Sequence, residues 1–223
     1  MDVEVCCLNF MDEARRTRMT ERFNCQGISV YFVDPVYHTD PRIDPRLDKR
    51  TTSNMLGHLD SIRHFYEDTT KPYAIICEDD ILLSKHFATD LPNIINRYKE
   101  LNLDVLLLGY LLPIRLTKDT PGFKPLDEIE GYTFYEFQHL WGSQMFLIHR
   151  KHAKFLLDKY TIAYATAHLD RPYSADWTLT KDGKRALLYP MLALEEGTEK
   201  SAHKVHSEFH QKCFTTNYSD VYV

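Results

Sequence analysis

Short apolar runs alternate along the chain with segments in which apolar residues recur at helical spacing. The runs predict strands over residues 3–10, 28–33, 74–77, 104–112 and 143–148. The helical spacing predicts helices over residues 12–23, 87–101 and 151–160, and another that begins at a Ser53 cap and includes Met55 to Tyr66. This alternation is typical of an α/β fold, and the continuous apolar run 74–77 is typical of a central parallel strand covered on both faces.

Two stretches lack this periodicity. Residues 34–53 are rich in Pro, Asp and Arg and are too long for an idle connector, so they form either a functional loop or a mobile one. Residues 113–130 are polar, hold three prolines and predict a loop. Because no internal repeat and no clear linker interrupts the order, we predict one domain over residues 1–223.

Composition narrows the class of protein. A chain of 223 residues that is 43% hydrophobic can bury one good core. Its 14 Tyr, 12 Phe and only 8 Gly argue against a disordered protein. The net charge of -5, without a long basic run, argues against a protein that binds nucleic acid.

Neither targeting signals nor cysteine motifs stand out. Residues 1–10 have no basic region ahead of their apolar residues, and no apolar stretch approaches the roughly 20 residues that span a bilayer. The five cysteines lack zinc or disulfide spacing, and the neighbours Cys6 and Cys7 point to opposite faces of a strand. We predict buried, reduced thiols, no transmembrane segment and a cytoplasmic location, which for a viral protein is the host cytoplasm.

The sharpest feature is the triplet Glu78-Asp79-Asp80, which directly follows the apolar run 74–77. Adjacent carboxylates at a strand end repel one another unless a cation or water relieves them. Ligands of open α/β sheets bind at the carboxyl ends of strands, and on an extended backbone Glu78 and Asp80 project to the same side. The triplet is therefore either an acidic turn or a site for a hard divalent ion, Mn²⁺ or Mg²⁺, held by Glu78 and Asp80.

A metal at this position would let an acidic protein bind an anionic nucleotide, whose pyrophosphate would supply further ligands. In a glycosyl transfer such a metal also stabilises the charge that builds on the departing diphosphate.

Five groups of residues, taken in their order along the chain, carry a resemblance to a known family. They are Cys6-Cys7-Leu8-Asn9-Phe10 with Arg15, Arg16 and Met19; Thr52 with Gly57-His58; IICEDDILL; WGSQMFLIHRKHAKFLLDKY; and SADWTLTK with ALLYPMLAL. This order resembles glycosyltransferase family 25, the lipopolysaccharide and procollagen galactosyltransferase-like enzymes. Gly57 stands where the family usually has Ser, Phe10 stands where it has Leu, and the similarity is poor after Leu194.

The resemblance implies a single GT-A-like domain with a Rossmann-like, mostly parallel central sheet flanked by helices. It implies a hexosyltransferase that moves a sugar from a nucleotide-sugar donor, often a UDP-hexose, to a hydroxyl of a glycan or glycoprotein, with inversion at the anomeric carbon. It also makes Asn9, Arg16 and His58 donor-side candidates, to which we add Asp79 and Gly142. From the residues alone, Arg16 on a helix is a solvated charge, and Gly142 permits close approach of the backbone to a ligand.

Asp176 is the candidate catalytic base. An inverting transfer requires a carboxylate that takes the acceptor's proton on the face opposite the diphosphate, and the metal carboxylates lie on the wrong side for that. The alternative is a helix cap, because Asp176 precedes Trp177 and a predicted helix. Glu195 and Glu196 are the rival candidates.

Three late histidines are candidate metal ligands, although their spacing matches neither HExxH nor a zinc finger. A polar tail with scattered histidines is usually exposed. The resemblance adds that GT-A enzymes often supply one late histidine to the metal. His203 is our first candidate for this ligand and His206 the second, and the third histidine of the tail is His210.

Aromatic residues before Gly142 are candidates for sugar sites, since the C–H face of a sugar packs on an aromatic ring. Because side chains alternate along a strand, every second residue of this set is expected to face the core, and we favour this for Phe134. The set is Tyr132, Phe134, Tyr135, Phe137 and Trp141.

Two other classes of function remain open. A metal-dependent nucleotidyltransferase would also place carboxylates at a strand end, but it usually brings a Gly-rich phosphate loop or a Lys/Arg cluster, and neither is apparent. A non-catalytic glycan-binding module would retain the aromatics without requiring Glu78 and Asp80 together.

Overall fold

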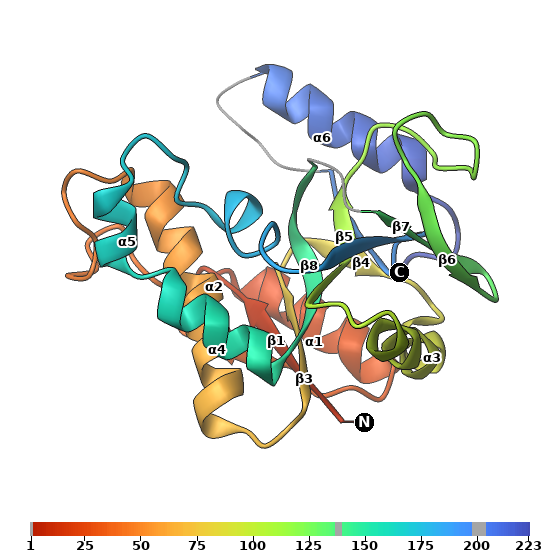
Figure 1. The fold of residues 1–223 in the computed structure, drawn as a ribbon, viewed down its shortest axis with the longest axis horizontal. Helices are drawn as coiled ribbons and strands as arrows, with labels where there is room; N and C mark the ends of the chain where they lie inside the picture. The colour runs from red at the N-terminus through yellow and green to blue at the C-terminus, as the bar shows by residue number, and fades with distance from the viewer. Residues whose placement is uncertain (1, 137–139, 198–203) are drawn as a thin grey trace.

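The computed structural model describes residues 2–136, 140–197 and 204–223. Its main sheet has eight strands in the order β2-β1-β3-β8-β5-β9-β7-β6 (Figure 1). These strands are β1 (Val3–Leu8), β2 (Tyr31–Val33), β3 (Tyr73–Cys77), β5 (Val105–Leu111), β6 (Pro125–Ile129), β7 (Tyr132–Glu136), β8 (Trp141–His149) and β9 (Arg185–Tyr189). A separate antiparallel pair joins β4 (Ile81–Leu83) to β10 (Ala193–Glu195).

Most strands of the main sheet run in one direction. Strand β1 is parallel to β2 and β3, and β5 is parallel to β9. Strand β8 is antiparallel to both β3 and β5, and β7 is antiparallel to both β9 and β6. Six of the eight strands therefore point the same way, and the predicted α/β fold with a mostly parallel central sheet flanked by helices is confirmed.

Helices cover both faces of the sheet, with α2 and α4 on one side and α1 and α3 on the other (Figure 1). The helices are α1 (Glu13–Cys25), α2 (Lys49–Asp68), α3 (Phe87–Glu100), α4 (Arg150–Lys159), α5 (Ile162–Ala167) and α6 (Lys204–Asn217), with a 3-10 turn η1 (Ala175–Trp177).

Alternate strand residues divide between these two cores. Cys6 and Phe146 belong to the core on the α2 side, whereas Cys7 and Leu147 belong to the core under α1 and α3. The prediction that Cys6 and Cys7 face opposite ways is confirmed, and both thiols are free and buried.

Two predictions were wrong, and one helix was missed. Helix α2 begins at Lys49 with Asp48 as its cap, rather than at Ser53, because the first turn of the helix is polar and shows no apolar spacing. The stretch 113–130 contains the strand β6, whose residues are at most half-buried and so give no apolar run. Helix α6 was missed because its buried face includes His210 and Asn217, which are not apolar.

The loop before α2 is held in place by ion pairs and by one buried apolar residue. Arg42 forms ion pairs with Asp40 and Asp60, at 2.9 and 2.8 Å, and Val36 is buried in the core.

Within the described ranges, no helix combines the length and the apolar character that crossing a bilayer requires.

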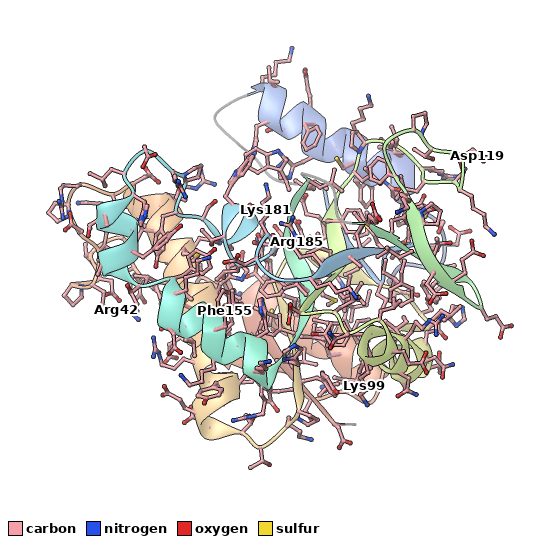
Figure 2. All side chains as sticks on the ribbon, viewed as in Figure 1. Arg42, Lys99, Asp119, Phe155, Lys181 and Arg185 are labelled. Atoms are coloured by element: carbon pink, nitrogen blue, oxygen red, sulfur yellow. The ribbon has the colours of Figure 1, made fainter. Side chains whose placement is uncertain are left out.

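Replacing a core phenylalanine with alanine tests the position of β8 at the centre of the fold. Phe146 is fully buried, and Phe146→Ala should lower the free energy of unfolding by about 3–5 kcal/mol. Phe155 on α4 is 42% exposed (Figure 2), so Phe155→Ala should have a much smaller effect. Urea unfolding of both variants measures the difference. Equal losses would contradict the placement of β8.

Candidate active site

The acidic triplet lies where β3 ends and β4 begins. The backbone N–H of Glu78 still donates to the Gln144 carbonyl of β8, at 3.0 Å, so β8 runs alongside this end of β3. The backbone N–H of Glu196, just after β10, donates to the Asp80 carbonyl at 2.7 Å. Segments from β8 and β10 are thereby brought to the carboxylates, as expected for a site at the carboxyl end of a strand.

Glu78 is held by two neighbours. The Ser143 hydroxyl donates to Glu78 Oε1 at 3.0 Å, and His58 Nε2 lies 3.4 Å from the same oxygen. Burial alone would raise the pKa of Glu78, but the contacts with His58 and Ser143 outweigh it and lower the pKa. His58 itself is fully buried on α2. It therefore positions Glu78, and its role on the donor side stays a prediction.

Asp79 links the end of β3 to the segment that follows β1. It accepts from Asn9 Nδ2 at 2.6 Å and from Arg15 Nη1 at 3.0 Å. Burial raises the pKa of Asp79, against the opposing effects of Arg15 and Asn9. Asn9 and Asp79, both predicted to bind the donor, are buried against each other and hold the strand ends together.

Asp80 has a carboxylate oxygen that lacks a hydrogen-bond partner. Its Oδ2 lies 3.3 Å from Arg15 Nη1, whereas its Oδ1 is buried and has no hydrogen-bond partner among the described residues. Burial raises the pKa of Asp80 well above its ordinary value, and the charges of Glu78 and Glu195 raise it further. A cation at Oδ1 would relieve both the missing contact and the repulsion.

The arginine that contacts the triplet is Arg15, the neighbour of the predicted donor-side candidate Arg16. Arg16 is exposed, with its guanidinium 4.5 Å from the centre of the Phe32 ring. Neighbouring helix residues point about 100° apart, so only one of the two arginines can face the strand end.

A histidine from α6 lies at this site. His210 Nδ1 is 2.7 Å from Glu195 Oε2, and both side chains are buried. His206 Nε2 lies 3.3 Å from His210 Nε2. The charge of His210 also helps to lower the pKa of Glu78, which places it near the triplet. His203, the predicted metal ligand, lies outside the described residues.

The side chains fit a hard cation that takes oxygen ligands. Glu78, Asp80 and Glu195 interact electrostatically, and Asp80 offers a buried free oxygen. Among the described residues, no group of three His, Cys, Asp or Glu side chains that includes Glu78 and Asp80 has its ligand atoms all within 4.8 Å of one another. The remaining ligands would therefore come from phosphate oxygens and water, as is usual for Mg²⁺.

Asp176 anchors the start of β8. Its Oδ1 accepts from the backbone N–H groups of Gly142 and Ser143, at 2.7 and 2.9 Å. Ser174 is the N-cap of η1, so the alternative of a helix cap at Asp176 was wrong. Burial raises the pKa of Asp176, and the charge of Glu78 adds to this.

Gly142 is required by protein packing. A Cβ at this position would lie 2.7 Å from Leu107 Cδ1 and 3.3 Å from Tyr110 Cβ. The glycine therefore permits a close approach to β5, and its predicted contact with a ligand stays a prediction.

The exposed aromatic surface beside Asp176 is a tryptophan pair. Trp141 and Trp177 are 47% and 42% exposed, and their rings meet edge to face with centroids 5.8 Å apart. The ammonium of Lys181 lies 3.2 Å from the centre of the Trp177 ring (Figure 2). Sequence reasoning found Trp141 but not Trp177.

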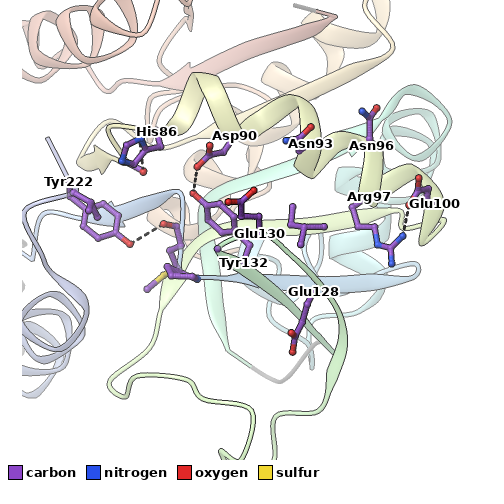
Figure 3. Close-up of a pocket in the computed structure, with 16 residues that line it drawn as sticks. His86, Asp90, Asn93, Asn96, Arg97, Glu100, Glu128, Glu130, Tyr132 and Tyr222 are labelled. Atoms are coloured by element: carbon purple, nitrogen blue, oxygen red, sulfur yellow. Dashed lines mark hydrogen bonds and ion pairs between the residues drawn. The ribbon is translucent and has the colours of Figure 1, made fainter.

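The other predicted aromatics lie elsewhere. Phe134 and Tyr135 are in the core, as favoured for Phe134. Tyr132 donates its hydroxyl to Asp90 at 2.7 Å. That pair lines a cavity of about 760 Å³ between α3, the β6–β7 hairpin and the C-terminal residues (Figure 3), which contains none of the triplet. Phe137 lies outside the described residues.

The chain was compared with known protein families, sequences and structures. No protein-family model and no curated protein sequence matches the chain. One similar solved structure is a glycosyltransferase involved in the glycosylation of the major capsid of PBCV-1; identity is 10%, coverage 92% of this chain and 98% of that chain, and the TM-score 0.48. Another is a mannose-1-phosphate geranyltransferase from Thermus thermophilus, at 10% identity, 87% and 74% coverage, and a TM-score of 0.46.

A glycine pair tests the packing at the start of β8. Gly142→Ala should destabilise the protein by about 1–3 kcal/mol, because the new methyl group overlaps the buried Leu107. Gly57→Ala is the matched control, since in the middle of α2 it meets only the flexible end of Leu8 at 3.1 Å. A helix gains up to about 1 kcal/mol from that change. Thermal unfolding should move in opposite directions, and a neutral Gly142→Ala would show that the site tolerates a side chain.

Proposed function

We propose that the chain is a metal-dependent glycosyltransferase that moves a hexose from a nucleotide-sugar donor to a hydroxyl of a glycan or glycoprotein. The observation that carries the proposal is the Oδ1 of Asp80 at the carboxyl end of β3, which is buried without a hydrogen-bond partner among the described residues and which experiences the negative charges of Glu78 and Glu195. This arrangement favours a divalent cation, and a cation there attracts a diphosphate.

Glu78 and Asp80 would hold Mn²⁺ or Mg²⁺ through oxygen. Bound there, the metal supplies positive charge to the diphosphate that leaves the sugar. His58 and Ser143 orient Glu78, and Arg15 holds the opposite oxygen of Asp80, so the free oxygen stays directed at the cation. The donor is a UDP-hexose in this proposal, in agreement with the family 25 resemblance.

The acceptor side is assigned to the tryptophan pair and Asp176. Exposed indole rings offer a platform for the C–H face of a sugar. Asp176 lies next to that platform, and burial raises the pKa of its carboxyl group, which makes the carboxylate a stronger base. The rivals are less suitable, because Glu196 is paired with Arg22 at 2.7 Å and Glu195 is buried against His210.

A donor screen tests this function. The purified chain is incubated with a panel of nucleotide sugars, with and without Mn²⁺, and products are separated by chromatography. A glycosyltransferase releases nucleoside diphosphate and free sugar slowly by hydrolysis and faster with an acceptor. Release of pyrophosphate from nucleoside triphosphate with a sugar phosphate would instead support a nucleotidyltransferase. No metal-dependent turnover of any donor would contradict the proposal.

Removing the charge of Asp80 tests the metal site. Asp80→Asn should abolish Mn²⁺-dependent binding of UDP, measured by isothermal titration calorimetry. Its thermal stability should be unchanged or higher, because the substitution removes repulsion from Glu78 and Glu195. Asp119→Asn, on a loop away from the triplet, is the matched control and should bind normally. Full activity of Asp80→Asn in excess Mn²⁺ would show that this carboxylate is not a ligand.

Two substitutions at Asp176 separate catalysis from anchoring. Asp176→Asn keeps an oxygen for the Gly142 and Ser143 N–H groups, so it should fold normally but lose roughly a hundredfold to ten-thousandfold in kcat. Nucleotide affinity should be retained. Asp176→Ala leaves both N–H groups without this acceptor and should in addition lower stability by about 1–3 kcal/mol. Near-normal turnover by Asp176→Asn would make Asp176 an anchor only.

A further inference from the structure

A second group of metal-ligating side chains lies on the α2 face of the sheet. Glu4 and Cys6 alternate on β1 and project to the same side, and α2 places His64 over them. One ligand atom from each of the three lies within 4.8 Å of the others. His64 Nε2 is 3.7 Å from Glu4 Oε1. Cys6 is fully buried, while Glu4 and His64 are partly exposed, so the group is open at one side.

The imidazole of His64 is fixed by two further contacts. Its Nδ1 lies 3.1 Å from Asp68 Oδ2, one turn later on α2. Its ring is stacked on Tyr31, with centroids 3.5 Å apart and planes 8° apart. A carboxylate at one ring nitrogen is the usual outer partner of a histidine that binds metal through the other nitrogen. Here that other nitrogen, Nε2, faces Glu4.

We propose that Glu4, Cys6 and His64 form a zinc site, with water in the fourth position and Asp68 orienting His64. A thiolate, an imidazole and a carboxylate are the ligands that Zn²⁺ takes in proteins. Zinc bond lengths of about 2.0–2.3 Å place tetrahedral ligand atoms roughly 3.3–3.6 Å apart. The observed 3.7 Å between His64 and Glu4 is close to that spacing.

Binding requires that Cys6 lose its proton. Burial raises the pKa of the Cys6 thiol, and the charges of Glu4 and Cys7 add to this. The S–H bond breaks as the S–Zn bond forms, and the proton leaves to solvent, so metal affinity should increase with pH. The site would cross-link β1 to α2, the helix that also carries His58 behind Glu78. His58 and His64 lie six positions apart, about 9 Å along the helix, so the two metal sites are distinct.

Cobalt substitution of the full chain tests the proposal. Co²⁺ added to metal-free protein should give the near-ultraviolet absorption of a thiolate–cobalt bond, and Zn²⁺ should displace it stoichiometrically. Cys6→Ser and His64→Gln should each abolish the band; His64 is partly exposed, so its variant should fold even if Cys6→Ser does not. Cys7→Ser is the matched control, since this neighbouring buried thiol faces the other core, and it should retain the band.

The result is separable from the proposed function. Asp80→Asn should keep the cobalt–thiolate band even though it removes the nucleotide-linked metal. Absence of a thiolate band in the wild-type chain would overturn the zinc site and leave a buried thiol beside a Glu4–His64 ion pair. A band that survives both Cys6→Ser and His64→Gln, or that is lost with Cys7→Ser, would overturn it as well.

Discussion

Unbalanced negative charge at the carboxyl end of β3 is the constraint around which the rest of the site is arranged. Arg15 reaches Asp79 and one oxygen of Asp80, and Arg22 neutralises Glu196. Glu78, Asp80 and Glu195 still interact unfavourably, and the second oxygen of Asp80 is buried without a partner in the described chain. A fold does not gain stability from such a group, because burying an unpaired charge is costly. In the proposed function, a cation bound at this oxygen would supply the missing partner.

The fold brings distant segments to this charge through strand direction. The reversed strand β8, between β3 and β5, starts beside Glu78, so Ser143 bonds Glu78 through its hydroxyl and Asp176 through its backbone. The small β4–β10 sheet brings Glu195 to the same place, and α6 adds His210. The metal carboxylates, the proposed base and the exposed tryptophans are thus linked through one short stretch of β8.

Local patterns in the sequence were sufficient for several elements and for the position of the triplet. Apolar runs located β3 and β5, and the triplet follows the end of β3, where Asp79 accepts from Asn9. An apolar run carries no direction, so the reversal of β8 was not predictable. The choice of Arg15 over Arg16 depends on helix rotation. His210 and the Glu4–Cys6–His64 group depend on packing between distant segments, which no spacing motif records.

The most direct measurement of the central claim is anomalous diffraction from crystals grown with Mn²⁺ and UDP. Data collected at the manganese absorption edge locate the ion without reference to activity. A peak is predicted within coordination distance of Asp80 Oδ1 and Glu78, bridged to the diphosphate. Occupied UDP with no manganese peak at these carboxylates, or with the ion bound elsewhere, would contradict the claim that the end of β3 is a metal site for the donor.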